Sequence, residues 1–123
     1  MGNGSAFLSG NFDQYYTVKY IAGIKVITKR NKNKKEADNT PLYSHTPNTM
    51  YARRDKNGKV TQISVYKNGI KVKDIEWGHK HKTFQIGDVH VSEYKNGIRE
   101  KEPREPTEEE SVIANKVKEQ DNG

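Results

Sequence analysis

Three Asn-Gly dipeptides divide the second half of the chain into short runs of strand-forming residues, and they limit the folds open to it. Asn-Gly favours the positive φ angles of a type I′ turn, which reverses the chain within two residues and joins antiparallel strands. The dipeptides at Asn57-Gly58, Asn68-Gly69 and Asn96-Gly97 therefore predict three reversals. They lie among runs rich in β-branched and aromatic residues, at positions 49–54, 60–67, 70–77, 89–94 and 98–101.

Two more strands are expected before these runs and one helix after them. Residues 15–20 and 24–30 are also strand-forming and flank a tight turn at Ala22-Gly23. Thr107-Glu-Glu-Glu110 has the pattern of a capping box, which places acids in the first turn of a helix over residues 107–119. The predicted fold is mainly β (α+β), an antiparallel meander sheet of about five to seven short strands with one C-terminal helix.

The composition limits the size of the core and excludes several classes of site. The chain has 123 residues, of which 31% are hydrophobic, so we expect one domain with a thin core over residues 15–119. Residues 1–14 are expected to be a linker or an unstructured start, and residues 120–123 a frayed tail. The absence of cysteine excludes disulfides and thiolate metal ligands. No apolar run reaches the roughly 18 residues of a membrane span, so no membrane partner is expected.

Charge is distributed unevenly along the chain. Residues 1–99 contain 18 Lys and Arg against 8 Asp and Glu, whereas residues 100–123 contain 4 against 8. A basic body with an acidic end suits a polyanion, so RNA or another nucleic acid is the expected partner. Ordinary solubility charge explains the same pattern equally well. The lysines of the polar loop at 31–41 can serve either purpose.

Three of the four histidines lie in the segment from Trp77 to Tyr94, which carries the candidate site. A hairpin with residues 83–88 as its loop predicts these cross-strand neighbours: His81 with His90, His79 with Ser92, and Trp77 with Tyr94. Such neighbours share a face and lie about 4.5–5.5 Å apart at Cβ. Three imidazoles would then gather on one surface, with Val89 and Val91 turned toward the core. A shift of one residue in the register would separate them.

Such a face contains the groups needed to cleave RNA without a metal. Imidazole titrates near neutral pH and can act as general base and as general acid. We predict His81 and His90 as the acid–base pair, with His79 as an orienting group or substitute acid. The other candidates are Arg53 or Lys80 as phosphate stabiliser, Trp77 and Tyr94 as stacking platforms for an unpaired base, Ser92 on the same face, and His45 as a fourth group from a loop.

The same residues also allow a metal site. His79, His81 and His90 are three nitrogen ligands, and His-x-His on one strand can hold zinc with a fourth position open. Glu76 and Asp88 would then be extra ligands or hydrogen-bond partners of the ligands. This alternative has zinc as cofactor, whereas the acid–base mechanism needs no cofactor.

Three motifs lie within about residues 40–106: Pro41-Leu-Tyr-Ser-His-Thr-Pro-Asn-Thr-Met-Tyr-Ala52, Trp77-Gly-His-Lys-His81 and Val89-His-Val-Ser-Glu-Tyr94. Together they are similar to small C-terminal domains of phage head-morphogenesis proteins and of polymorphic toxins of Gram-positive bacteria. Many such toxin tips are metal-independent ribonucleases of the barnase–EndoU–colicin–RelE type. The resemblance therefore implies a ribonuclease toxin that acts in the cytoplasm of a target cell and has a cognate immunity protein. Barnase-like domains usually carry helices before the sheet, whereas the helix expected here follows it.

A second function from a different class also fits this resemblance. A phage or mobile-element module would be virion-associated and would bind nucleic acid or a protein partner without catalysis. The histidines would then be incidental, His45 would be solvated, and Trp77 and Tyr94 would form a cross-strand core pair. Incubation with RNA, with and without EDTA, separates the ribonuclease, the zinc enzyme and the non-catalytic module.

Overall fold

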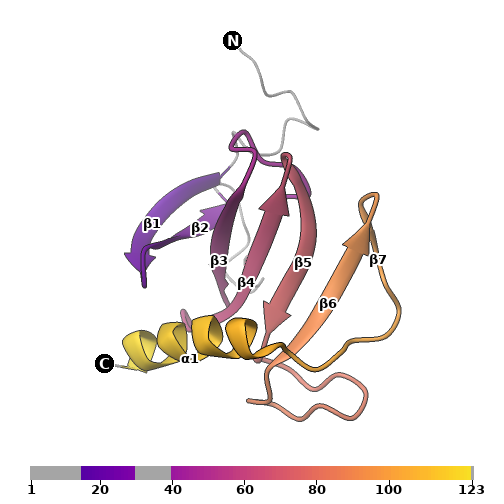
Figure 1. Ribbon diagram of the computed structural model, residues 1–123. Coiled ribbons are helices and arrows are strands. Elements are labelled where there is room, and N and C mark those ends of the chain that lie inside the picture. The colour runs from indigo at the N-terminus through magenta and orange to yellow at the C-terminus, as the bar shows by residue number, and fades with distance from the viewer. Residues whose placement is uncertain (1–14, 30–39, 123) are drawn as a thin grey trace.

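The computed structural model of this chain describes residues 15–29 and 40–122. In these residues seven strands form one curved sheet in the order of the sequence, and one helix lies across one end of it (Figure 1). The elements are β1 (Tyr15–Ile21), β2 (Ile24–Lys29), β3 (Thr49–Arg54), β4 (Val60–Lys67), β5 (Ile70–Glu76), β6 (His90–Lys95), β7 (Ile98–Arg99) and α1 (Glu108–Asn122). The predicted fold, mainly β with a C-terminal helix, is confirmed. The expected linker at 1–14 and most of the polar loop at 31–41 lie outside the described residues.

The strand pairs of the described sheet are antiparallel with one exception. β2 and β3 run parallel, and they pair Lys25 with Tyr51 and Val26 with Ala52. A pure antiparallel meander was expected, so this pair is a correction. The segment between the two strands carries no Asn-Gly reversal, and a longer connection leaves the direction of the next strand to tertiary packing.

All three Asn-Gly dipeptides lie at chain reversals, but only two form the predicted type I′ turn: at Asn57-Gly58 only the glycine has a positive φ, of 87°, and the loop closes through a hydrogen bond from Gly58 N to Asp55 O (3.0 Å). Asn68-Gly69 has φ angles of 54° and 81°, and Asn96-Gly97 has φ angles of 53° and 82°. Both residues of each turn therefore occupy the left-handed region that a type I′ turn requires. The turn at Ala22-Gly23 has similar angles of 51° and 78°.

One face of the sheet is apolar and forms the main core. Side chains alternate along each strand, which places Ile63 of β4, Ile75 of β5 and Val91 of β6 on this face, each no more than 1% exposed. Ala114 and Val117 of α1 are fully buried and pack against the same core. Val91 therefore faces the core as predicted.

Helix α1 begins with the predicted capping box. Thr107 N donates to Glu110 Oε1 (2.8 Å), and Glu110 N donates to Thr107 Oγ1 (3.2 Å). Arg104 donates to both carboxylate oxygens of Glu110 at 2.9 Å, and Lys73 lies 2.5 Å from Oε2. These cations hold the pKa of the Glu110 carboxyl well below its usual range. The helix start is thereby fixed to β5.

The helix continues beyond its predicted end at residue 119. Gln120 Oε1 accepts a hydrogen bond from Ala22 N (2.7 Å), and Asp121 Oδ2 accepts one from Val60 N (2.9 Å). Asn122 Oδ1 accepts another from Lys59 Nζ (2.6 Å). Residues 120–122 are therefore tied to the sheet, and the expected fraying of this segment is wrong.

The opposite face of the sheet is polar, although much of it is buried. Six of its side chains belong to residues no more than 5% exposed: Gln62, Ser64, Asp74, Glu76, His90 and Ser92. Burying charged and polar groups is unfavourable unless they are paired. A row of them on one face of a small sheet is a feature of functional sites.

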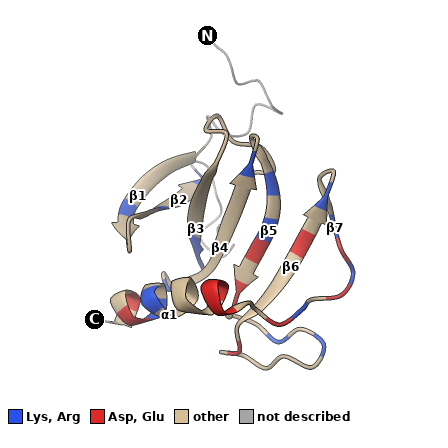
Figure 2. Cartoon of the chain, in the orientation of Figure 1, with Lys and Arg blue, Asp and Glu red and all other residues tan. Residues whose placement is uncertain are grey.

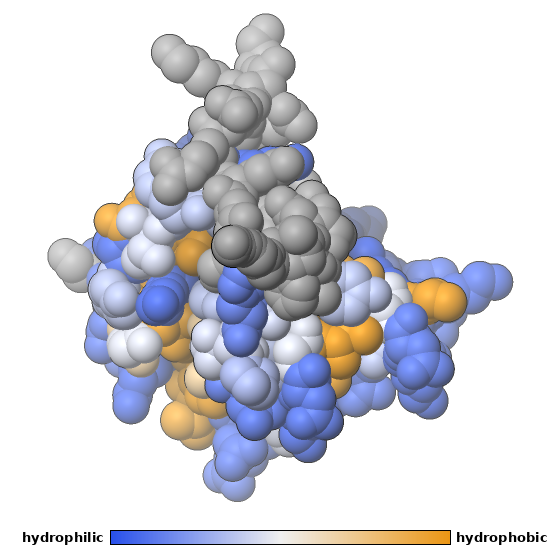
Figure 3. All heavy atoms as spheres, turned by 90° about the horizontal axis from the view of Figure 1, so that it is seen from above, coloured by the Kyte–Doolittle hydropathy of each residue, from blue (hydrophilic) through white to orange (hydrophobic). Residues whose placement is uncertain are grey.

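The described surface is mainly hydrophilic. Viewed from above, hydrophobic residues appear as small patches between polar ones (Figure 3). Acidic residues lie on β5, on β6, on α1 and between β7 and α1, and basic residues lie on most elements, including these three (Figure 2). In the described part of the chain, no helix has the length and apolar character needed to span a bilayer.

Candidate metal centre

The histidine segment does not form the predicted hairpin. β6 pairs with β5 instead, in the register Glu76 to His90, Ile75 to Val91 and Asp74 to Ser92. Residues 77–89 form a loop with a tight turn, in which His81 and Phe84 exchange two backbone hydrogen bonds of 2.9 Å. The predicted pairings of His81 with His90, His79 with Ser92 and Trp77 with Tyr94 are therefore wrong.

Burial of apolar and charged side chains explains the observed register. The predicted hairpin placed Lys80 and Lys82 on the same side as Val91, which faces the core. In the structure Ile75 lies beside Val91, and both lysines are exposed in the loop. Desolvating an ammonium group costs several kcal/mol, whereas pairing two apolar residues is favourable. The chain therefore extends β5 only to Glu76 and leaves the lysines in solvent.

The loop nevertheless returns His79 and His81 to His90. The ring centroids of the three histidines lie 5.1, 5.4 and 5.8 Å apart. Glu76 joins them, and one ligand atom from each of the four residues lies within 4.8 Å of the others. Ligand atoms of a tetrahedral zinc are about 3.4 Å apart when each bond is about 2.1 Å long. A contraction of at most about 1.4 Å would bring these four atoms to that spacing.

His90 is fully buried at the centre of this cluster. Its Nδ1 lies 3.1 Å from the backbone oxygen of Asp88 and donates to it, so in a neutral ring the lone pair is on Nε2. Nε2 lies 3.7 Å from Glu76 Oε2 and has no hydrogen-bond partner among the described residues. The ring of Phe84 stacks on His90 at 5.2 Å between centroids. A metal ion would satisfy this buried nitrogen.

His79 and His81 favour their neutral forms. Desolvation lowers the pKa of both rings, and nearby basic groups lower it further, chiefly His90 at His79 and Arg99 at His81. Glu76 opposes the shift in both cases. A neutral imidazole can donate a lone pair to a metal or accept a proton as a general base.

Glu76 is held beside His90 by residues from β6 and β7. Its Oε2 accepts hydrogen bonds from Ser92 Oγ (3.1 Å) and from Arg99 Nη2 (3.2 Å). Arg99 Nη2 also donates to Ser92 Oγ (3.0 Å). The three residues form a closed set of contacts that fixes the orientation of the carboxylate toward the histidines.

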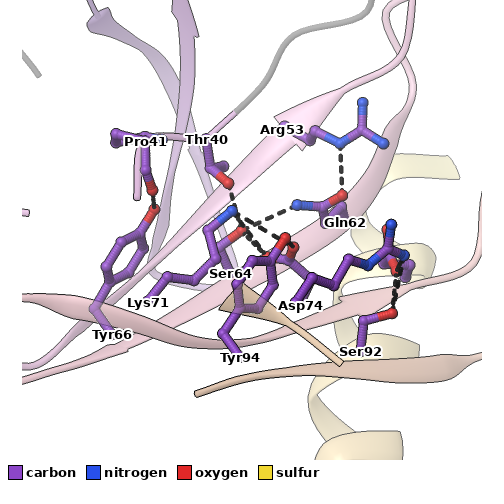
Figure 4. Close-up of polar contacts among 12 residues, drawn as sticks. Thr40, Pro41, Arg53, Gln62, Ser64, Tyr66, Lys71, Asp74, Ser92 and Tyr94 are labelled. Carbon is purple, nitrogen blue, oxygen red and sulfur yellow. Dashed lines mark hydrogen bonds and ion pairs between the residues drawn. The ribbon is translucent and has the colours of Figure 1, made fainter. Parts of the chain in front are cut away.

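A polar cleft of about 340 Å³ lies beside the cluster. It is lined by Thr40, Arg53, Gln62, Lys71, Asp74, Glu76, His79, Tyr94 and Arg99. A chain of hydrogen bonds crosses it, from Arg53 Nε to Gln62 (2.7 Å), from Gln62 to Ser64 Oγ (3.0 Å) and from Ser64 to Asp74 (2.5 Å) (Figure 4). The polar face is therefore ordered by side chains from β3, β4 and β5.

Asp74 is the centre of these contacts. Tyr94 donates its hydroxyl to Asp74 Oδ2 (3.0 Å), and Lys71 Nζ lies 3.4 Å from Oδ1. Lys71 also lies over the Tyr94 ring, 5.1 Å from its centroid. Burial lowers the pKa of Lys71, whereas Asp74 acts to raise it. Tyr94 also lines the cleft, and its role as a stacking platform for a base stays a prediction.

Three of the predicted site residues lie away from the cluster. Trp77 is 6% exposed and belongs to the apolar core, so it cannot stack a base from this position. Lys80 is exposed in the loop and does not line the cleft. His45 is exposed and lines a different cavity beside the turn between β4 and β5. Arg53 and Ser92 do belong to the site.

Sequence reasoning did not identify Asp74, Lys71 and Arg99. The usable signal was alternation, because Asp74 and Glu76 stand two residues apart in a strand and flank the apolar Ile75. Arg99 follows the turn at Asn96-Gly97 and pairs with Tyr94, which brings it to the same face.

The fold and the cluster define a small, mainly β domain with a histidine–carboxylate site suited to a transition-metal ion. Comparison with known proteins finds no match to a family model, to a curated protein or to a solved structure. Membership of a phage or toxin family therefore stays a prediction.

Proposed function

We propose that this domain is a metal-dependent hydrolase that binds zinc through His79, His81 and His90 and uses Glu76 as general base. One observation carries the proposal. Four ligand atoms lie within 4.8 Å of one another, and one of them is the buried Nε2 of His90, which has no hydrogen-bond partner among the described residues. Imidazole nitrogens suit zinc and other late transition metals, whereas calcium and magnesium prefer oxygen ligands.

Three histidines leave the fourth position of a tetrahedral zinc ion for water. Zinc lowers the pKa of bound water to about 7, so a hydroxide is available at neutral pH. Glu76 lies next to this position, and its contacts with Ser92 and Arg99 compete with direct binding of Oε2 to the metal. This supports Glu76 as the group that accepts the proton of the water.

Metal content tests the ligand set. After dialysis against zinc and then buffer, we expect one zinc per chain in the wild type by elemental analysis. His79→Ala and His90→Ala should each lose the ion, whereas His45→Ala, a histidine outside the cluster, should retain it. His90 is fully buried, so circular dichroism in EDTA must show that each variant is folded. If a folded His79→Ala variant binds as much zinc per chain as His45→Ala, the proposal is overturned.

The role of Glu76 is tested by Glu76→Gln. If Glu76 is the base, the variant keeps one zinc per chain and loses hydrolytic activity by about 10²–10⁴-fold. Replacing zinc with cobalt gives a visible spectrum that reports coordination, and it should stay nearly unchanged in this variant. Loss of the metal in Glu76→Gln would instead make Glu76 the fourth ligand of a closed, structural site.

The metal-independent ribonuclease is the second candidate. His79 favours this reading, because it lines the same cleft as Arg53 and its pKa is lowered, as suits a general base. Fully buried His90 suits a ligand better than a catalytic acid. RNA cleavage that persists in EDTA would select this mechanism, and loss of cleavage in EDTA would select the zinc enzyme. A cognate immunity protein stays a prediction of the family resemblance alone.

A further inference from the structure

We infer that the polar cleft beside the histidine cluster binds the phosphate of a single-stranded nucleic acid, which makes a phosphodiester the substrate of the site. This inference rests on the proposed metal-dependent hydrolase. The cleft has a volume of about 340 Å³, at the lower end of the usual range for ligand pockets, and its lining is mainly polar. It reaches Glu76 and His79, so a group bound in it lies against the metal position.

The charges in the cleft favour an anion. Arg53, Lys71 and Arg99 line it, against two carboxylates from Asp74 and Glu76. Both carboxylates are already engaged: Asp74 by Ser64, Tyr94 and Lys71, and Glu76 by Ser92 and Arg99. A bound zinc ion would add two further positive charges at the edge of the same cleft. With Lys71 protonated, three cations against two carboxylates give the cleft a formal charge of +1 before a metal binds.

Arg99 is the cation best placed to contact a phosphate. Its Nη2 donates to Glu76 and Ser92, and these two contacts fix the guanidinium beside the cluster. The structure shows no partner for its Nε and Nη1 in the described part of the chain, and its side chain is 43% exposed. A guanidinium that is fixed at one nitrogen and open at the others is suited to a two-point contact with phosphate oxygens.

The depth of the metal position favours a single strand over a duplex. His90 is fully buried and Glu76 is 4% exposed, so a scissile phosphate must enter the cleft to reach the metal. A single strand can bend its backbone into a narrow cleft, whereas the phosphates of a duplex lie on a stiff, convex surface. The basic surplus of residues 1–99 adds a non-specific attraction for the rest of the strand.

The reaction in this site is hydrolysis of one P–O bond. A zinc ion held by the three histidines would supply a bound water. Glu76 would accept one proton of this water and later release it to solvent, and the water oxygen would form a bond to phosphorus. The bond from phosphorus to the leaving sugar oxygen breaks, and that oxygen takes up a proton from solvent. The products are a phosphomonoester end and a free hydroxyl end. Arg99 and the metal stabilise the negative charge that develops on the phosphate oxygens.

Oligonucleotide binding tests the inference separately from the metal. The fluorescence anisotropy of a labelled single-stranded oligonucleotide is measured with zinc-free protein in EDTA. The result is therefore valid whether or not zinc is the cofactor. We expect Arg99→Gln and Arg53→Gln to weaken binding by about tenfold each. Lys95→Gln, which removes one exposed charge outside the cleft, should change it by less than about twofold. A duplex of the same length should bind more weakly, and inorganic phosphate should compete. Equal effects of Arg99→Gln and Lys95→Gln would overturn the inference.

Model substrates separate this inference from the proposed function. Zinc-loaded protein is given bis(p-nitrophenyl) phosphate, a phosphodiester, and p-nitrophenyl acetate, a carboxylic ester. If the wild type hydrolyses the phosphodiester and Arg99→Gln does so more slowly, the result supports both the metal-dependent hydrolase and the phosphodiester assignment. Hydrolysis of the acetate alone would retain the metal-dependent hydrolase and overturn the phosphodiester assignment. Failure to bind zinc would overturn the proposed function, and the anisotropy measured in EDTA would still decide whether the cleft binds nucleic acid.

Discussion

Gly78 is the residue whose substitution most directly tests the path of the histidine loop. A Cβ at this position would lie 2.5 Å from Thr61 Cβ and 2.7 Å from Thr61 Cγ2, far inside the ordinary carbon–carbon contact of about 3.5–4.0 Å. Thr61 lies on β4 and is 8% exposed, so it has little room to move. The first turn of the loop therefore packs against the sheet at a distance that only glycine allows.

The expected effect of Gly78→Ala is the balance of two terms. Alanine restricts the unfolded chain, which favours folding by about 0.4–1 kcal/mol where the backbone angles allow it, and φ of Gly78 is not positive. The contact with Thr61 opposes this with an overpacking cost of about 1–3 kcal/mol. We expect a net loss of about 1–2 kcal/mol, which lowers the urea midpoint by about 0.5–1 M. The shifted loop should also weaken zinc binding, because it carries His79 and His81.

Urea unfolding followed by the fluorescence of Trp77, the single tryptophan, measures this effect in EDTA. The matched test is a double-mutant cycle with Thr61→Gly, which removes the atoms in the way. In that background Gly78→Ala should cost less than about 0.5 kcal/mol. If Gly78→Ala is neutral or stabilising in the wild-type background, the loop does not pack on β4 at this point, and the proximity of the histidines to His90 loses its structural basis.

Three further outcomes follow from the same structure. Glu110→Gln should destabilise the fold by about 2 kcal/mol at pH 7, because Arg104 and Lys73 lose a charged acceptor. The pKa of Glu110 is depressed in the folded state, so this contribution to stability is present above the unfolded pKa of about 4.3 and is lost as the pH falls below it. The free energies of unfolding of the wild type and the variant, measured at several pH values, should therefore converge in acid. Zinc release should begin only below about pH 6.5, because the pKa of His79 and His81 is lowered. A colorimetric chelator measures the released zinc. Half of the zinc released above pH 7 would contradict the proposed histidine ligands. Phe84→Ala should weaken zinc binding by about tenfold, whereas Phe84→Leu, which keeps an apolar side chain against His90, should not. Calorimetry measures both affinities, and equal zinc affinities of Phe84→Ala and the wild type would show that Phe84 does not support the site.

The turns made most of the fold predictable from the sequence. A two-residue turn such as Asn68-Gly69 determines both the reversal and the register of its two strands, because Asn and Gly tolerate the positive φ angles that it needs. The capping box at Thr107 and Glu110 fixed the helix start in the same local way. These features depend on residues close in sequence, so they need no knowledge of the rest of the molecule.

The register of the histidine segment could not be predicted by the same local reasoning. No Asn-Gly dipeptide lies between residues 77 and 89, so nothing local fixes the register across this loop. The register depends on a long-range comparison, in which Val91 pairs with Ile75 and the lysines of the loop remain in solvent. The end of α1 is a similar case, because its last turn is held by β4 through Asp121 and Val60.

The buried polar face is itself an argument for function, because stability alone does not account for it. With 31% hydrophobic residues, the chain has little apolar surface to bury, yet it places Asp74, Glu76, Lys71 and His90 inside. Buried ion pairs of this kind are often no more stable than apolar residues of the same size. Most of these groups are paired, but His90 Nε2 is left with only a carboxylate at 3.7 Å. A bound metal ion supplies the missing interaction, and binding free energies of about 10–16 kcal/mol for structural zinc would exceed the desolvation cost of a single imidazole. This unsatisfied nitrogen is the reason why the proposed function places a metal ion at the cluster.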